Sequence, residues 1–328
     1  MIGLTTYAQG RLEMALSLFE MVVFPGFLFL GVLGILFEYF DRILCARLQN
    51  RQGPPWYQPF ADFVKLGAKE DIIPREADSV MFVLAPLLAA TASVVAFFYI
   101  PFWGGRALFS FAGDAVVVIY LLTIPTMSFF LAGWYSTSLY ATIGAVRTVT
   151  QLFAYEVPLF LVILAPGIMA GTWSLSEIAL FFSNNPLLAL TNIPGFIVAV
   201  IALQGKLERP PFDIPEAKTE IVGGTFTEYS GRLYAMLHLG IDIEMIVGAA
   251  LLAAVFIPFG IQIGGVLGCL IFILKIGFII FLLSVIKASV ARIRIEQMVN
   301  FCWKYVAPLA VLQLFISMIL GAFIGGGE

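Results

Sequence analysis

Long apolar runs alternate with short polar segments along most of the 328-residue chain. A helix needs about 20 apolar residues to cross the hydrocarbon core of a bilayer. Hydropathy predicts eight transmembrane helices, over residues 17–40, 79–101, 115–135, 155–171, 187–205, 234–259, 264–286 and 305–325. The fourth run is short, and helical-looking sequence from Ser138 onward extends it backward. The expected fold class is an all-α, polytopic integral membrane protein with one membrane domain.

An amphipathic helix is predicted between the first two spans. A turn-rich strip, residues 52–59, precedes Phe60, Phe63 and Val64, which recur at helical spacing among polar residues. This pattern is typical of a helix that lies in the membrane interface, with Trp56 at headgroup level. A surface helix packed on protein explains it equally well.

Composition supports the membrane class, since 61% of the residues are hydrophobic and 12% are charged. The net charge of −3 gives no indication of nucleic-acid binding. Arg11 and Glu13 precede the first apolar run, and no small-residue cleavage site follows it, so the first span is expected to be retained.

The residues that usually bind redox metals are scarce. The chain has Cys45, Cys269 and Cys302, no Cys-x-x-Cys pair, and His238 as its one histidine. Iron–sulfur, zinc and bis-histidine haem sites all need more of these ligands than one chain of this composition offers. We therefore predict that this chain binds no metal and no cofactor of its own.

The basic residues predict the orientation of the helices, because Lys and Arg gather in cytoplasmic loops. Arg11 and Arg106 fall on one side of the predicted spans, Lys275 falls within a span, and the other fifteen of the 18 fall on the opposite side. Residues 41–78 and 206–233 are therefore expected to be cytoplasmic loops, with both termini outside. The fifteen are Arg42, Arg47, Arg51, Lys65, Lys69, Arg75, Arg147, Lys206, Arg209, Lys218, Arg232, Lys287, Arg292, Arg294 and Lys304.

Residues 208–231 contain an unusual concentration of acids. Their carboxylates are Glu208, Asp213, Glu216, Glu220 and Glu228. Prolines and glycines interrupt the stretch, and a broken backbone at membrane depth survives only where it is buried in protein or lines a cavity. A solvated loop is the simpler interpretation. Apolar residues interleaved with the acids favour a packed element instead.

Glu216 and Glu220 are predicted to lie one helical turn apart, because Pro215 is a favourable first residue for a helix. At about 6 Å and an effective dielectric constant of about 20, two carboxylates repel by roughly 3 kcal/mol, or about two pKa units. One of the pair would then hold a proton near neutral pH. That property suits a proton relay.

Other acids lie within the predicted spans, where a charge near the bilayer centre costs about 2.5–3.5 kcal/mol and is usually functional. Glu156 begins the fourth span, and Asp242 and Glu244 lie in the sixth. A structural pair of Asp242 with His238 or Lys275 is the alternative to a functional role.

Four motifs in the same order resemble subunit 1 of NADH:quinone oxidoreductase (respiratory complex I) and the matching subunit of energy-converting membrane-bound hydrogenases. They are Arg51-Gln-Gly-Pro with Gln58-Pro-Phe-Ala-Asp-Phe-Val-Lys65, Gly133-Trp-Tyr-Ser-Thr-Ser-Leu-Tyr-Ala141 with Gly144-Ala-Val-Arg147, Pro211-Phe-Asp-Ile-Pro-Glu-Ala-Lys-Thr-Glu220 with Glu228-Tyr-Ser-Gly231, and Lys287-Ala-Ser-Val-Ala-Arg-Ile-Arg294. The resemblance covers nearly the whole chain.

The chain departs from the quinone-reducing members in two places. The loop from Gly53 to Pro59 is short, as in the hydrogenase branch, and Lys218 stands where a carboxylate is often found. The resemblance therefore implies a ferredoxin-dependent complex, either a membrane-bound hydrogenase or a sulfur reductase. Its alternatives are a quinone-site subunit, with a cavity between the first span, the sixth span and the amphipathic helix, and a self-sufficient cation transporter, although no internal repeat is seen.

By resemblance, this membrane protein carries no redox centre of its own, anchors a peripheral arm and couples its chemistry to proton or sodium translocation. Expected partners are hydrogenase-like large and small subunits, an iron–sulfur subunit, antiporter-like membrane subunits and the lipids of the cell membrane. Iron–sulfur clusters, with nickel–iron in the hydrogenase branch, belong to those partners. The expected docking residues are Arg51, Arg147, Arg292 and Arg294. The expected proton relay is Glu156, Glu208, Asp213, Glu216, Glu220, Glu228 and Asp242.

Overall fold

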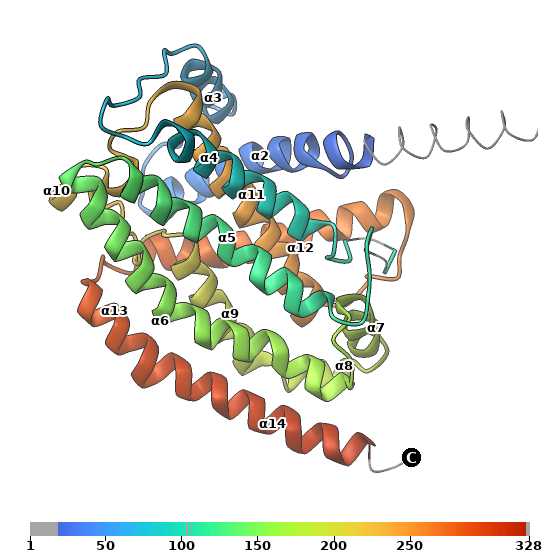
Figure 1. Ribbon diagram of the computed structural model, residues 1–328. Coiled ribbons are helices and arrows are strands. Elements are labelled where there is room, and N and C mark those ends of the chain that lie inside the picture. The colour runs from blue at the N-terminus through green and yellow to red at the C-terminus, as the bar shows by residue number, and fades with distance from the viewer. Residues whose placement is uncertain (1–18, 103, 106, 326–328) are drawn as a thin grey trace, which may run out of the picture.

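The computed structural model describes residues 19–102, 104–105 and 107–325, and this part of the chain is helical without strands (Figure 1). Arg11, Glu13 and Arg106 lie outside the described residues. Seven helical stretches in the described part are long and apolar enough to span a membrane. The all-α, multi-pass fold class is therefore confirmed. The helices are α2 (Phe27–Leu48), α3 (Gln58–Gly67), α4 (Ser79–Phe97), α5 (Asp114–Tyr135), α6 (Leu139–Ala170), α7 (Leu175–Asn184), α8 (Pro186–Leu190), α9 (Ile193–Lys206), α10 (Lys218–Ile221), α11 (Gly231–Phe256), α12 (Gly265–Ser289), α13 (Ile295–Phe301) and α14 (Ala307–Gly325).

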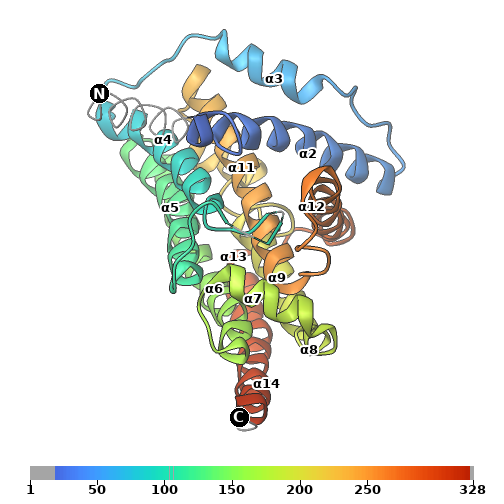
Figure 2. The same cartoon turned by 90° about the vertical axis from the view of Figure 1, so that its right-hand side faces the viewer.

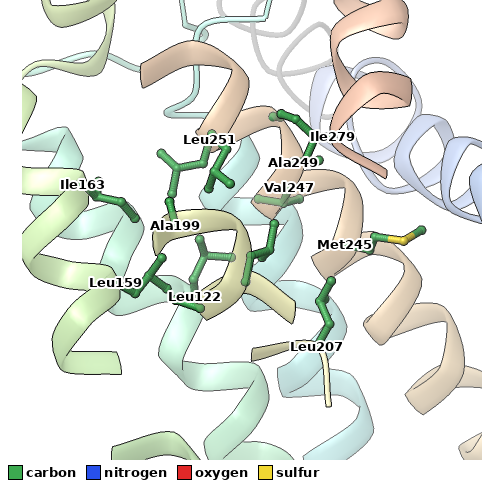
Figure 3. Close-up of a cluster of buried hydrophobic side chains, with 14 of the residues drawn as sticks. Leu122, Leu159, Ile163, Ala199, Leu207, Met245, Val247, Ala249, Leu251 and Ile279 are labelled. Carbon is green, nitrogen blue, oxygen red and sulfur yellow. The ribbon is translucent and has the colours of Figure 1, made fainter. Parts of the chain in front are cut away.

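The helix α11 is the centre of the bundle. Its most apolar stretch is 94% buried, against 33% for α12 and 28% for the stretch that contains α14. It contacts α2, α4, α5, α9 and α12, and the side chains of α5, α6, α9 and α11 interdigitate in one apolar cluster (Figure 3). From Met245 to Phe256 the helix α11 is apolar on every side, as expected for a helix in the interior of a bundle.

The helices α5, α6 and α14 run side by side, with α14 packed on α6 and α9 (Figure 1). A π-helical turn, Cys302–Val306, joins α13 to α14, so the last span begins earlier than hydropathy alone indicates. The backward extension of the fourth span is also present, since α6 begins at Leu139.

The predicted helix over 187–205 is two helices in the structure. Proline occupies the first turn of both α8 and α9, and α9 has 14 residues, fewer than a straight span needs. Proline suits a helix start but interrupts a helix that is already running, which explains the division. The amphipathic helix α7 precedes them, and hydropathy does not predict it.

The predicted amphipathic helix corresponds to α3, which lies across α2 at one end of the bundle (Figure 2). Its Phe60 and Val64 are exposed, as is the preceding Trp56, whereas Phe63 turns toward the protein. An apolar outer face favours contact with lipid over a plain surface helix. The ends of the bundle therefore differ, with α3, α10 and α13 at one and α7 and α8 at the other (Figure 1).

Candidate functional site

The acidic stretch folds back onto α5 and α6 as a packed element. Gly224 has a φ of +54°, and an added Cβ would lie 1.7 Å from the carbonyl oxygen of Pro215. A Cβ on Gly144 of α6 would lie 2.5 Å from the backbone nitrogen of Thr225. Only glycine permits both the left-handed turn and this approach of the loop to the helix. The packed interpretation of residues 208–231 is therefore correct.

Glu208 is the most enclosed acid of this stretch. Its side chain is 8% exposed, its φ is +49°, and its Oε1 atom has no hydrogen-bond partner in the described structure. The Thr148 hydroxyl of α6 lies beside the carboxyl group and donates to the carbonyl oxygen of Gly144 at 3.3 Å. Burial, followed by the nearby charges of Glu216 and Glu244, raises the pKa of Glu208 well above its ordinary value. Enclosure therefore favours the protonated form of this carboxyl group.

The predicted Glu216–Glu220 pair does not form, because Pro215 and Glu216 lie in a turn and α10 begins at Lys218. Glu220 is exposed, and Arg147 donates to its Oε2 atom at 2.7 Å. That hydrogen bond and the arginine charge lower the pKa of Glu220, so this acid stays ionised. Burial raises the pKa of Glu216, and the negative charge of Asp213 raises it further.

Asp213 lies against the loop that follows α12. Its Oδ1 atom is 2.9 Å from Nε of Arg292, which also donates to the Asp213 carbonyl oxygen. Burial nevertheless raises the pKa of the Asp213 carboxyl, since desolvation outweighs the arginine charge. Glu228 is half-buried on the same stretch. The structure therefore brings Glu208, Asp213 and Glu216 together in one enclosed region.

The four arginines predicted to dock a partner divide into two groups. Arg147 and Arg292 bind the chain's own acidic stretch, through Glu220 and Asp213. Arg51 and Arg294 are exposed, and neither has an ion pair within the part of the chain that the structure describes.

A buried ion pair that the sequence analysis missed lies just inside this region. Nζ of Lys206 is 2.9 Å from Oε1 of Glu244, and both side chains are at most 3% exposed. The same Nζ donates to the carbonyl oxygen of Leu122 and, at 3.4 Å, to Thr126, which hydrogen-bonds the hydroxyl of Tyr155. The charge pattern assigns Lys206 to a loop, which is wrong. Its place at the end of an apolar helix is the signal that it is buried.

A second missed cluster surrounds Asp41, which is buried in α2 rather than lying in the predicted loop 41–78. Its carboxylate accepts from Arg209 at 3.1 Å, Lys287 at 2.6 Å and Ser284 at 2.6 Å. Arg209 also lies 3.6 Å from Asp242 of α11. Asp242 therefore pairs with Arg209, and no ion pair with His238 or Lys275, the structural alternative, is found among the described residues.

Glu156 is half-buried on α6, within electrostatic range of Lys206. Phe153 and Val157 beside it are exposed on the outer surface of the bundle. No ion pair or hydrogen bond of its carboxylate is found within the described residues. An acid on a membrane helix beside lipid-facing residues is costly and is therefore a functional candidate.

A polar cavity of about 230 Å³ lies between α2, α3 and α11. Its walls include Glu38, Arg42, His238 and Asp242. Arg42 bridges Glu38 and, at 3.0 Å, Asp62 of α3. These are the three elements between which the sequence analysis placed a cavity for a lipid-soluble ligand.

No group of three or more His, Cys, Asp or Glu side chains with metal-binding geometry occurs in residues 19–102, 104–105 and 107–325. Cys45, Cys269 and Cys302 are free thiols.

The chain is similar to proteins of one family along nearly its whole length. The NADH dehydrogenase family matches residues 19–318. A subunit of the NADH-quinone oxidoreductase of Carboxydothermus hydrogenoformans is 34% identical, with 96% of this chain and 93% of that protein covered. The NADH-quinone oxidoreductase subunit 8 of Thermus thermophilus is also 34% identical, with 86% and 81% covered.

A solved structure supports the same assignment. A chain of the membrane-bound sulfane sulfur reductase, an archaeal respiratory membrane complex, superimposes with a TM-score of 0.79 at 27% identity, with 89% of this chain and 96% of that chain covered. Both sequence and fold thus confirm the resemblance that the four motifs indicate. The chain belongs to the NADH dehydrogenase family, as a multi-pass membrane subunit of the complex I type.

Proposed function

We propose that this chain is the membrane subunit of a ferredoxin-dependent respiratory complex, in which it anchors a peripheral electron-transfer arm and conducts protons. The buried Glu208 carboxyl is the observation that carries the proposal. It has one unpaired oxygen, a raised pKa, and acids on both sides of it. Such a group exchanges protons readily when a neighbouring charge changes.

Within the relay, Asp213 and Glu216 form the end toward the surface. A change of charge in the peripheral arm, next to residues 208–231, alters the electrostatic field at Glu216. The charge of Glu216 in turn raises the pKa of Glu208. When Glu208 releases its proton, the Lys206 ammonium group stabilises the resulting carboxylate. The Thr126 and Tyr155 hydroxyls, held beside Lys206, extend the polar path toward α6. Glu228 and Asp242 remain candidates at the edges of this region.

Glu156 supports an exit from the relay to another subunit. It lies on the outer face of α6, and its unpaired carboxylate points to a membrane partner with a polar group at the same depth. An antiporter-like subunit packed on α6 would meet this requirement.

Quinone reduction is the second candidate function. The relatives named as NADH-quinone oxidoreductase subunits and the cavity between α2, α3 and α11 favour it. The short loop from Gly53 to Pro59 and Lys218 favour the ferredoxin-dependent branch.

Purification of the native complex through a tag on this chain tests the proposed function. We expect peripheral iron–sulfur and hydrogenase-like subunits together with antiporter-like membrane subunits. A nickel-binding large subunit identifies the hydrogenase branch, and quinone reduction by the purified complex would favour the second candidate. Isolation of this chain alone, with ion flux in liposomes, would instead show a self-sufficient transporter.

The proposed orientation predicts where an engineered cysteine can be labelled. A cysteine at Lys218, which is exposed beside α10, should react with a membrane-impermeant maleimide only in inverted vesicles. A cysteine at Leu187, in α8 at the other end of the bundle, should react only in intact cells and serves as the matched control. The reverse pattern would place residues 206–233 outside.

The proposed docking face predicts that charge reversal releases the arm. The double variant Arg51→Glu and Arg294→Glu should lose the peripheral subunits at moderate salt, because exposed charges steer and hold a partner through screened attraction. Arg51→Lys with Arg294→Lys keeps both charges and should retain the arm. Unchanged co-purification of the reversed variant would exclude these arginines from docking.

A further inference from the structure

An apolar groove of about 710 Å³ opens on the outer surface of the bundle, and its mouth adjoins the segment that carries Asp213. Two helices form its walls, and a loop and α13 close one end. The residues that define it include Val200 and Ile201 of α9, Leu282, Val285 and Ile286 of α12, and Phe301 of α13.

The mouth of the groove is built by two loops that are bound to each other. The backbone nitrogen of Ile293 donates to the carbonyl oxygen of Pro211 at 3.3 Å, and Arg292 pairs with Asp213. Pro211 and Ile293 both line the groove. The mouth therefore has a fixed shape.

A charged surface depression of about 250 Å³ adjoins the mouth, and Ile293 lines both spaces. The depression contains Arg147, Arg292 and Arg294 together with the acids Glu220 and Glu296. The first two are neutralised by Glu220 and Asp213, which leaves Arg294 as the cation without an ion pair in the described part of the chain. Next to it, Gln297 lines the groove, and its Oε1 accepts from the Arg294 backbone nitrogen, so its amide group is free to donate.

We propose that this groove binds a phospholipid with an anionic headgroup. An acyl chain fills the space between α9 and α12, and the phosphate lies against Arg294 and the Gln297 amide. Basic pockets between membrane helices at the cytoplasmic surface are typical sites for anionic lipid headgroups. The lining of the groove is almost wholly apolar, which suits an acyl chain.

Groove filling tests the proposal. The complex carrying Val285→Trp, purified, stripped with detergent and examined by native mass spectrometry, should lose tightly held phospholipid that the wild type keeps. Leu274→Trp, on the exposed face of the same helix, introduces the same side chain outside the groove and should keep it. If Val285→Trp prevents assembly, Val285→Phe and Ile201→Phe fill the groove with smaller side chains.

The headgroup contact has its own readout. In titrations of the stripped complex, Arg294→Gln should reduce the preference for phosphatidylglycerol over phosphatidylcholine by about fivefold, the value that about 1 kcal/mol per cation near an anionic lipid corresponds to. Because Arg294 is also a proposed docking residue, loss of the peripheral subunits is scored separately from lipid binding. Wild-type lipid retention in an assembled groove-filling variant would overturn the proposal. A second result would also overturn it. In this result, a partner subunit shields the cysteine of Val285→Cys from a lipophilic maleimide and can be crosslinked to it.

Discussion

Glu208→Gln is expected to leave assembly intact while the ion gradient formed per electron pair collapses. Glutamine keeps the shape and hydrogen-bonding capacity of the side chain but has no acidic proton to release. Loss of a positioned proton donor typically costs a factor on the order of 10² in rate, so turnover should also fall if electron transfer waits for the proton. Both quantities are measured in inverted vesicles from one preparation.

Variants of two other glutamates serve as controls for this result. Glu296→Gln, at an exposed acid of α13, should change neither quantity. Glu220→Gln should have a smaller effect than Glu208→Gln, because the Arg147 pair keeps Glu220 ionised. Full loss of the gradient in Glu220→Gln, with normal coupling in Glu208→Gln, would place the relay at the surface of the loop.

The raised pKa of Glu208 also has a consequence for stability that does not depend on activity. A carboxyl group whose pKa is higher in the folded state stabilises that state below its unfolded pKa, and this contribution is lost as pH rises through the folded value. Thermal midpoints of the wild type should therefore fall toward alkaline pH more steeply than those of Glu208→Gln.

Lys206→Met is expected to destabilise the protein by about 3–5 kcal/mol, because it leaves the Glu244 carboxylate buried without a counter-charge. The measurable outcome is less folded protein in detergent and a lower thermal midpoint. Removing both charges in Lys206→Met with Glu244→Leu should restore most of the loss, since an apolar pair of similar volume tolerates burial well.

Lys275→Met is the matched control for the single variant. Lys275 lies within α12 and has no ion pair in the described part of the structure, so its replacement leaves no acid uncompensated. Equal loss of stability in Lys206→Met and Lys275→Met would show that the buried pair contributes little beyond the packing of one long side chain.

Most of the fold follows from the length of apolar runs, because a bilayer admits few elements besides helices of about 20 residues. This argument fails where the element is shorter than a span. Residues 187–205 are divided by the proline near the start of α9, and α7 has only 10 residues, too few to stand out in a hydropathy window.

The candidate site is only partly predictable for a different reason. Its acids are visible in the sequence, but their partners come from distant segments, as with Asp41 and Lys287, which are 246 residues apart. Local spacing therefore suggested the wrong neighbour for Glu220, whose partner Arg147 lies on α6, 73 residues away. The environment that sets each proton affinity is a property of the packed loop.

The central position of α11 constrains how the protein is made. This helix follows four of the long apolar stretches and the short α9 in chain order, and it brings Asp242 and Glu244, each of which costs about 2.5–3.5 kcal/mol when unpaired at a helix centre. Their counter-charges, Lys206 and Arg209, are synthesised just before them. The end of α9 must therefore remain beside the insertion site until α11 arrives, so that the ion pairs form during biogenesis and the later helix α12 closes over a neutralised core.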